Sequence, residues 1–346
     1  ACYTDKTCMR NALVFALGQA LGRWNPRTRF VEVFVHEQRG KLSMENYLGL
    51  YVFEEKVTRD KARVDIAKLG PGDTRAPEIT GGYIFKKDHA ERGRRVRWDA
   101  DGPPMIATPP IKTGFPTPPG GFPADPAGFL PSLGTDTFTR PGRSGVGGVV
   151  RMPMERTREN FPPRAVTNYS TGAQRLMTRL DDAEIFPEAE AFSTTLQRAV
   201  LYYVDPEPDE ITAVQRAWLK DYLNDFEAAL YGPDFTDPEK GYQKFIERDS
   251  FIDFHLISEV TKNVDSFRFS TFYHKPRGGR LKMGPLWDWN LSYGNCEGKQ
   301  GYMPERWLWP QLNDQEYSWF RRLFEDPDFG QRYVDRWGEL RGNIFA

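Results

Sequence analysis

Cysteine is scarce in this chain of 346 residues, which contains only Cys2, Cys8 and Cys296. No two of them have Cys-x-x-Cys spacing, and the four histidines show no metal-binding spacing, which argues against a structural zinc site. We expect three unpaired cysteines. A bridge from Cys296 to Cys2 or Cys8 is the alternative, and it would imply an oxidising compartment.

Long apolar runs and an excess of one charge are also absent. No segment approaches the ~20 apolar residues that span a bilayer, so we expect no transmembrane segment. The formal net charge of −1 argues against a nucleic-acid partner or a polybasic membrane surface. Because the first residue is Ala rather than Met, we expect a truncated N-terminal lobe, with any secretion signal upstream of Ala1.

Several common catalytic motifs are missing. The chain has no Gly-x-Gly-x-x-Gly loop, no His-Arg-Asp and no Gly-x-Ser-x-Gly, so it carries neither the usual kinase signatures nor a hydrolase nucleophile elbow. Aromatic residues, by contrast, are abundant. The 24 Phe, 15 Tyr and 9 Trp predict a sizeable buried core.

Apolar periodicity indicates a mixture of helices and strands. Leu13, Leu17 and Leu21 recur at helical spacing, and Gly22 ends this predicted helix. Three alternating segments follow and predict, with the helix, a small antiparallel sheet lobe; they lie at 29–36, 47–57 and 82–87. Further helices, a hairpin and a helical tail are predicted at 212–231, 251–262, 267–287 and 319–340.

A long segment between these two groups is rich in proline and glycine and cannot sustain regular structure. We interpret residues 91–196 as a partly disordered insertion with one helix near 171–180. The prediction is therefore an α+β fold. Its small antiparallel sheet lobe covers 1–90 and its mainly helical lobe covers 197–346.

Two acidic residues flank the predicted hairpin. Asp265 precedes its first strand and Asp288 follows its second, so an antiparallel hairpin delivers both to the same end. Hard divalent cations prefer oxygen ligands, and a cation relieves the repulsion between two carboxylates. Protein kinases use this order, with a catalytic-loop Asp before such a hairpin and a metal-binding Asp after it. The alternative is that Asp265 caps a turn and Asp288 only ends a strand.

Two blocks around these acids resemble the signature of the CotH kinase family of spore coat protein H-like atypical kinases. They are Asn263-Val-Asp265-Ser-Phe and Met283-Gly-Pro-Leu-Trp-Asp288-Trp-Asn290-Leu-Ser-Tyr-Gly-Asn295. Upstream segments are similar too: Met9-Arg10-Asn11, Tyr47-Leu-Gly-Leu-Tyr-Val-Phe-Glu-Glu55, Arg59-Asp60-Lys61, Gly81-Gly-Tyr-Ile-Phe-Lys-Lys87 and Pro206-Glu-Pro-Asp-Glu210. The resemblance implies a bilobal kinase-like fold that uses ATP and Mg²⁺ or Mn²⁺ to phosphorylate Ser or Thr of a protein substrate.

The resemblance also implies roles for matching residues. Asp288 would bind the metal, and Asp265 would act as base or orient the acceptor hydroxyl. Lys87 would reach the ATP phosphates, with Lys86 as second choice, because strand alternation lets only one of them face the cleft. Glu55 is the candidate partner of that lysine. The alternatives are that the lysines only protect an edge strand and that Glu55 is a solvated carboxylate.

Two departures from the family pattern concern the metal site. Ser270 stands where the family often has Asn, and a hydroxyl is a weaker ligand than an amide oxygen. Asn290 stands where the family often has Asp; it still offers an oxygen but lacks the charge.

These departures keep a second hypothesis open, a catalytically weak or inactive binding protein of a coat or cell surface. A third hypothesis is another nucleotide-dependent transfer, such as that of AMP. Relatives that are surface proteins imply an extracellular or cell-surface location.

Overall fold

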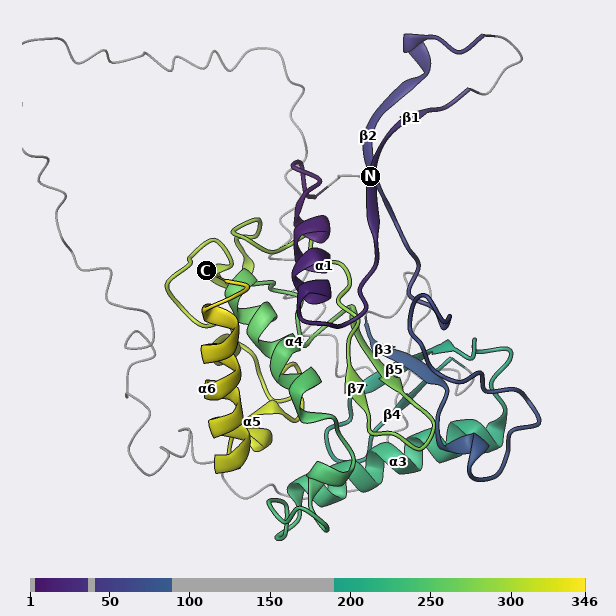
Figure 1. Ribbon diagram of the computed structural model, residues 1–346, viewed down its shortest axis with the longest axis vertical. Helices are drawn as coiled ribbons and strands as arrows, with labels where there is room; N and C mark the ends of the chain where they lie inside the picture. The colour runs from purple at the N-terminus through teal and green to yellow at the C-terminus, as the bar shows by residue number, and fades with distance from the viewer. Residues whose placement is uncertain (1–3, 37–40, 89–189, 346) are drawn as a thin grey trace, which may run out of the picture. The chain divides into compact units, whose positions relative to one another are not determined.

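The computed structural model describes residues 4–36, 41–88 and 190–345 (Figure 1). All of them belong to one compact unit formed by Ala1–Phe122 and Ala183–Ala346. Most of the predicted insertion at 91–196, including its helix near 171–180, lies outside the described residues. The last part of that range is described, and Ala191–Ser193 form strand β4.

The predicted α+β class is confirmed. The helices are α1 (Arg10–Ala20), α3 (Ala213–Tyr231), α4 (Arg248–Thr261), α5 (Phe320–Leu323) and α6 (Pro327–Arg341). The strands are β1 (Thr28–Phe34), β2 (Tyr47–Glu54), β3 (Tyr83–Lys87), β4 (Ala191–Ser193), β5 (Val200–Asp205), β6 (Thr271–Lys275) and β7 (Lys282–Met283). None of the helices in the described part of the chain is long and apolar enough to cross a membrane.

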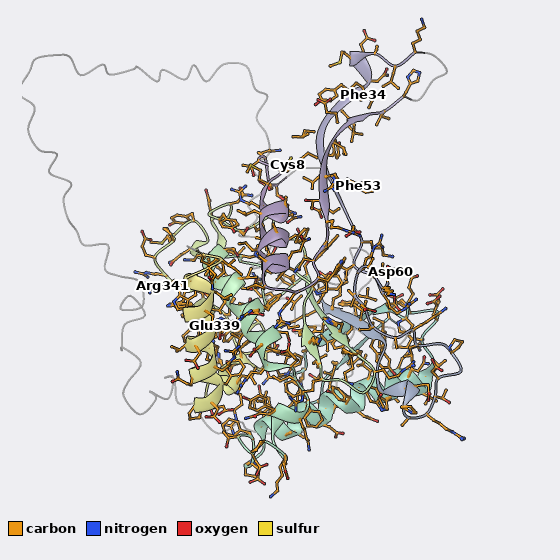
Figure 2. All side chains as sticks on the ribbon, viewed as in Figure 1. Cys8, Phe34, Phe53, Asp60, Glu339 and Arg341 are labelled. Carbon is orange, nitrogen blue, oxygen red and sulfur yellow. The ribbon has the colours of Figure 1, made fainter. Side chains whose placement is uncertain are left out.

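The strands form two antiparallel sheets rather than one N-terminal sheet. β1 pairs with β2 as a two-stranded ribbon, and the second sheet has the order β4-β5-β3-β6-β7 (Figure 1). The prediction that β3 joins the first two strands was therefore wrong, because β3 is enclosed by β5 and β6 instead. The ribbon carries exposed aromatic side chains, including Phe53, which is 67% exposed (Figure 2).

Helix α1 buries a different face from the one that the leucine spacing predicted. Asn11, Val14, Phe15 and Gly18 are buried, whereas Leu13 is exposed. Gly18 explains the choice of face, because a β-carbon at this position would lie 2.2 Å from the Nδ2 atom of Asn25. The close approach of Gly18 to Asn25 turns this face of the helix inward, and the polar Asn11 lies on the same face.

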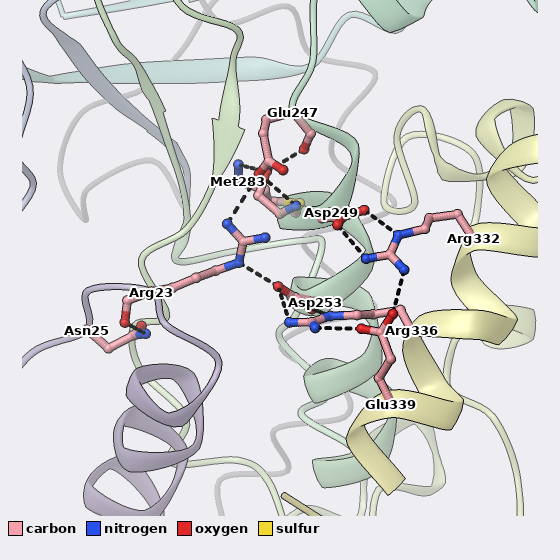
Figure 3. Close-up of polar contacts among 10 residues, drawn as sticks. Arg23, Asn25, Glu247, Asp249, Asp253, Met283, Arg332, Arg336 and Glu339 are labelled. Atoms are coloured by element: carbon pink, nitrogen blue, oxygen red, sulfur yellow. Dashed lines mark hydrogen bonds and ion pairs between the residues drawn. The ribbon is translucent and has the colours of Figure 1, made fainter. Parts of the chain in front are cut away.

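Helices α3 and α4 begin at side-chain caps and supply much of the core. Thr212 accepts a hydrogen bond from the Gln215 amide in the predicted capping box, and Glu247 accepts one from Ser250. Helix α4 is buried almost throughout its length. Charged groups tie it to its neighbours, since Asp253 accepts hydrogen bonds from Arg23 beyond α1 and from Arg336 on α6 (Figure 3).

The C-terminal part departs from the predicted continuous helix. Two helices replace it, the short α5 and then α6, which starts at Asp326 as N-cap followed by Pro327. Asp326 is 2% exposed and also accepts a hydrogen bond from the hydroxyl of Tyr242. The break is therefore fixed by a cap and a proline, which both favour the start of a new helix.

Candidate functional site

Asp265 lies in the turn that links α4 to β6. Helix α4 ends at Lys262, which adopts a left-handed conformation with φ of 49°. The Asp265 carbonyl accepts backbone hydrogen bonds from Arg268 and Phe269, so the main chain closes the turn. Its carboxylate lies 4.0 Å from the Arg268 guanidinium, and 25% of the side chain stays exposed. A ligand can therefore reach it.

Asp288 follows β7 by five residues and has a positive φ of 59°. Asp and Asn tolerate this left-handed region better than most residues. The Asn290 amide donates to Asp288 Oδ1 at 2.5 Å, and the Asn295 amide donates to the Asn290 carbonyl at 2.8 Å. The segment after β7 is thus folded back on itself around Asp288.

Hydrogen bonds join the segments that carry the two acids. The Trp289 indole donates to Thr261 Oγ1 at 2.8 Å, and the Tyr293 amide donates to the Thr261 carbonyl at 2.7 Å. The Val264 amide donates to the Leu291 carbonyl at 3.4 Å. Because Trp289 and Val264 are the immediate neighbours of the acids, these bonds hold the two acid-bearing segments side by side.

The electrostatics agree with this arrangement. Burial raises the pKa of Asp265 to about 6; the Arg268 charge opposes this rise, and the charges of Asp288 and Asp88 add to it. Burial also raises the pKa of Glu54, with a further contribution from Asp288, against the hydrogen bond from Asn11. Negative charge is therefore concentrated around Asp288.

Among the residues that the structure describes, no three acidic, His or Cys side chains converge as a ready-made metal site. The donors fit a cation nonetheless, since two coupled carboxylates and an amide are oxygen-bearing groups and their repulsion would be relieved by positive charge. Mg²⁺ is commonly held by one or two carboxylates together with substrate phosphates. Ser270, half-buried with φ of 49°, directly precedes β6.

The two lysines of β3 point to different surroundings. The Lys87 ammonium donates to the carbonyls of Gln315 and Glu316 and to the Ser318 hydroxyl. Burial lowers its pKa to about 7. Lys86 instead binds Asp88 at 2.6 Å, and the charge of Asp88 contributes to the raised pKa of Asp265. The charge of Asp88 thus relates Lys86 to Asp265.

Glu55 is not brought to either lysine. It pairs with Arg27 at 2.5 Å and lies 3.7 Å from Arg63, and the hydrogen bond from Arg27 lowers its pKa to about 2. Its neighbour Glu54 is the carboxylate near Asp288. Adjacent residues of an extended chain face opposite ways, so the Glu54 carboxylate lies on the opposite face from that of Glu55.

Sequence reasoning also missed Arg268 and Asn11. Arg268 Nε forms an ion pair with Glu316 Oε1 at 2.9 Å, and Glu316 also binds Lys299 at 3.1 Å. A cationic side chain three residues after the candidate base, directly behind the Asp265 block, was a signal that could have identified Arg268. Asn11 belonged to a segment similar to the family but had been given no role.

The cysteines differ from the expectation of three unpaired thiols. Cys8 is disulfide-bonded, whereas Cys296 is free. The alternative bridge through Cys296 is excluded as well. Burial raises the pKa of the Cys296 thiol.

Comparison with known proteins identifies the family. No curated protein sequence matches this chain. A family model described as CotH kinase protein matches residues 1–103 and 170–346, which is most of the chain and includes both segments that carry the acids. The predicted resemblance is therefore confirmed, and the chain belongs to the CotH kinase protein family.

Proposed function

We propose that this protein transfers phosphate from Mg-ATP to Ser or Thr of a protein substrate. The coupling of Asp265 to Asp288 across hydrogen-bonded segments carries this proposal. The corresponding fold is a bilobal, kinase-like one. Its five-stranded sheet takes β3 from residues 1–90 and the other strands from residues 191–283, so the predicted sheet lobe at 1–90 and helical lobe at 197–346 share this sheet.

In this proposal Asp288, assisted by Asn290 and Ser270, would hold a divalent cation, which would supply positive charge for the ATP phosphates. Asp265 orients the acceptor hydroxyl and takes up its proton, and its exposed part leaves room for that hydroxyl. Phosphoryl transfer requires mainly positioning and charge stabilisation, which two acids and a cationic side chain can supply.

Lys86 is the lysine that we favour for the phosphates, ahead of Lys87. The charge of its partner Asp88 contributes to the raised pKa of Asp265, and a phosphate could replace Asp88 at the Lys86 ammonium. Lys87 has three oxygen partners in the 315–318 segment, which a phosphate would have to displace.

A catalytically weak or inactive binding protein is the second candidate. Its supporting observation is that Asn290 points its amide hydrogens at Asp288, which occupies one carboxylate oxygen. The disulfide-bonded Cys8 suits an extracellular or cell-surface location in either case, since disulfides persist in oxidising compartments.

Thermal unfolding with ATP, with and without Mg²⁺, tests the proposal. Ligand at about 100 times its Kd should stabilise the protein by roughly 2.7 kcal/mol. Asp288→Ala should abolish the Mg²⁺-dependent part of this shift. Asp234→Ala, which removes an acid that is 63% exposed, is the matched control and should retain it.

Transfer of labelled phosphate to a protein acceptor gives the second readout. Asp265→Ala and Asp288→Ala should abolish it, and Lys86→Ala should reduce it more than Lys87→Ala does. Unchanged transfer in both aspartate variants would overturn the mechanism. Binding without transfer would select the inactive protein, and an adenylate mass on the product would select AMP transfer.

A further inference from the structure

The backbone at Asp288 is held from outside its own segment. Its φ of 59° lies in the left-handed region, which Asp tolerates better than most residues but which is still less favourable than the usual backbone conformations. The amide groups on either side, at Leu286 and Trp289, are both used for this purpose. Each donates to the side-chain oxygen of an asparagine that comes from the N-terminal part of the chain.

Asn11 supports the segment after Asp288. It lies on the buried face of α1, is 8% exposed, and its Oδ1 accepts from the Trp289 amide at 2.7 Å. This backbone donor fixes the orientation of the amide group, so Nδ2 is free to donate to Glu54 Oε1 at 2.8 Å. One side chain therefore joins the Asp288 segment to the end of strand β2.

Asn25 supports the segment before Asp288. It is 2% exposed, and its Oδ1 accepts from the Leu286 amide at 2.7 Å while Nδ2 donates to the Arg23 carbonyl at 3.2 Å. It packs against Gly18, where any larger residue would collide with it. Its position is therefore fixed by α1, as is that of Asn11.

We propose that Asn11 and Asn25 are positioning residues, which hold the Asp288 backbone from both sides and orient its carboxylate toward the proposed cation. The inference rests on the proposed function, because it assigns a role relative to the same cation. Outer groups that orient metal ligands commonly contribute about tenfold to a hundredfold to metal affinity.

Titration with Mn²⁺ in the presence of a non-hydrolysable ATP analogue, followed by electron paramagnetic resonance, measures this role without turnover. Asn11→Leu and Asn25→Leu remove the acceptors, and we expect the Mn²⁺ Kd to rise about tenfold to a hundredfold. Asn25→Asp keeps an oxygen that accepts from the Leu286 amide. Because a buried carboxyl takes up a proton, the variant adds no charge, and its Mn²⁺ Kd should stay within about threefold of that of the parent protein.

Gln215→Leu is the structural control. Gln215 is a fully buried amide on α3 that donates to the Gly70 carbonyl at 2.7 Å. Its removal should lower the unfolding temperature but leave the Mn²⁺ Kd unchanged. If the leucine variants fail to fold, Asn11→Ser and Asn25→Ser shorten the side chains beyond reach of the amides, and the same rise in Kd is expected.

The outcomes separate the two claims. If Asp288→Ala abolishes Mn²⁺ binding but folded Asn11 and Asn25 variants bind as the parent protein does, the positioning role is overturned and the proposed function stands. If the parent protein shows no Mn²⁺ binding that depends on Asp288, the proposed function fails and this inference fails with it.

Discussion

The surroundings of Asp265 bring the pKa of its carboxyl to about 6 through burial, against the opposing charge of Arg268. As a base it must be ionised, so kcat/KM, which reports the free enzyme, should rise about tenfold per pH unit below that value and level off above it. Initial rates of phosphate transfer between about pH 5 and about pH 8 measure this. A flat profile over that range would contradict the assignment of Asp265 as base.

Arg268 provides the control for this profile. Because its charge lowers the pKa of Asp265, Arg268→Met should move the rising limb to higher pH. Arg268→Lys keeps the charge and should leave the limb closer to that of the parent protein.

At the scale of elements, the start of α3 depends on a reciprocal capping box. The Gln215 amide donates to Thr212 Oγ1 at 3.4 Å, and the Thr212 amide donates to Gln215 Oε1 at 3.0 Å. Thr212→Ala should lower the free energy of unfolding by about 1 kcal/mol, since an amide loses its partner. Denaturant titration measures the change. Thr212→Ser keeps the hydroxyl, and an equal loss in both variants would show that the cap has no effect.

At the scale of the whole molecule, Asp253 connects helix α4 to helix α6 and to the loop that follows α1 (Figure 3). Its side chain is 1% exposed and binds Arg23 Nε at 2.6 Å and Arg336 Nε at 2.7 Å. Asp253→Ala leaves two arginines without this carboxylate, and we expect the free energy of unfolding to fall by about 3–5 kcal/mol. Calorimetry or denaturant titration measures it.

Glu339 is the matched control for Asp253. It also binds Arg336, at 2.9 Å, but it is 47% exposed, so water can replace it. Glu339→Ala should destabilise the protein far less than Asp253→Ala. Similar losses of unfolding free energy in the two variants would show that burial does not make the Asp253 ion pairs more stabilising than an exposed pair.

Local patterns in the sequence carried much of the fold. The apolar spacing and the capping box placed α3 nearly to the residue, because capping chemistry and amphipathic spacing are local properties. Helix α4 was predicted from its apolar residues alone, and it begins three residues before the predicted start, at Arg248 after the N-cap Glu247. The strand β5 was missed, although its sequence Val-Leu-Tyr-Tyr-Val is typical of a strand. It lies in the range 197–346, which we predicted to be mainly helical, and no strand was expected at 200–205.

Spacing along the chain was enough to predict the α+β class and the family, which are confirmed, and to single out Asp265 and Asp288 as the candidate pair. The inward position of Asn11 on α1, the proximity of Glu54 rather than Glu55 to Asp288, and the different partners of Lys86 and Lys87 became visible only in the folded chain. Neighbouring residues of a strand or helix face different directions, and packing against segments distant in sequence decides which of them reaches the site.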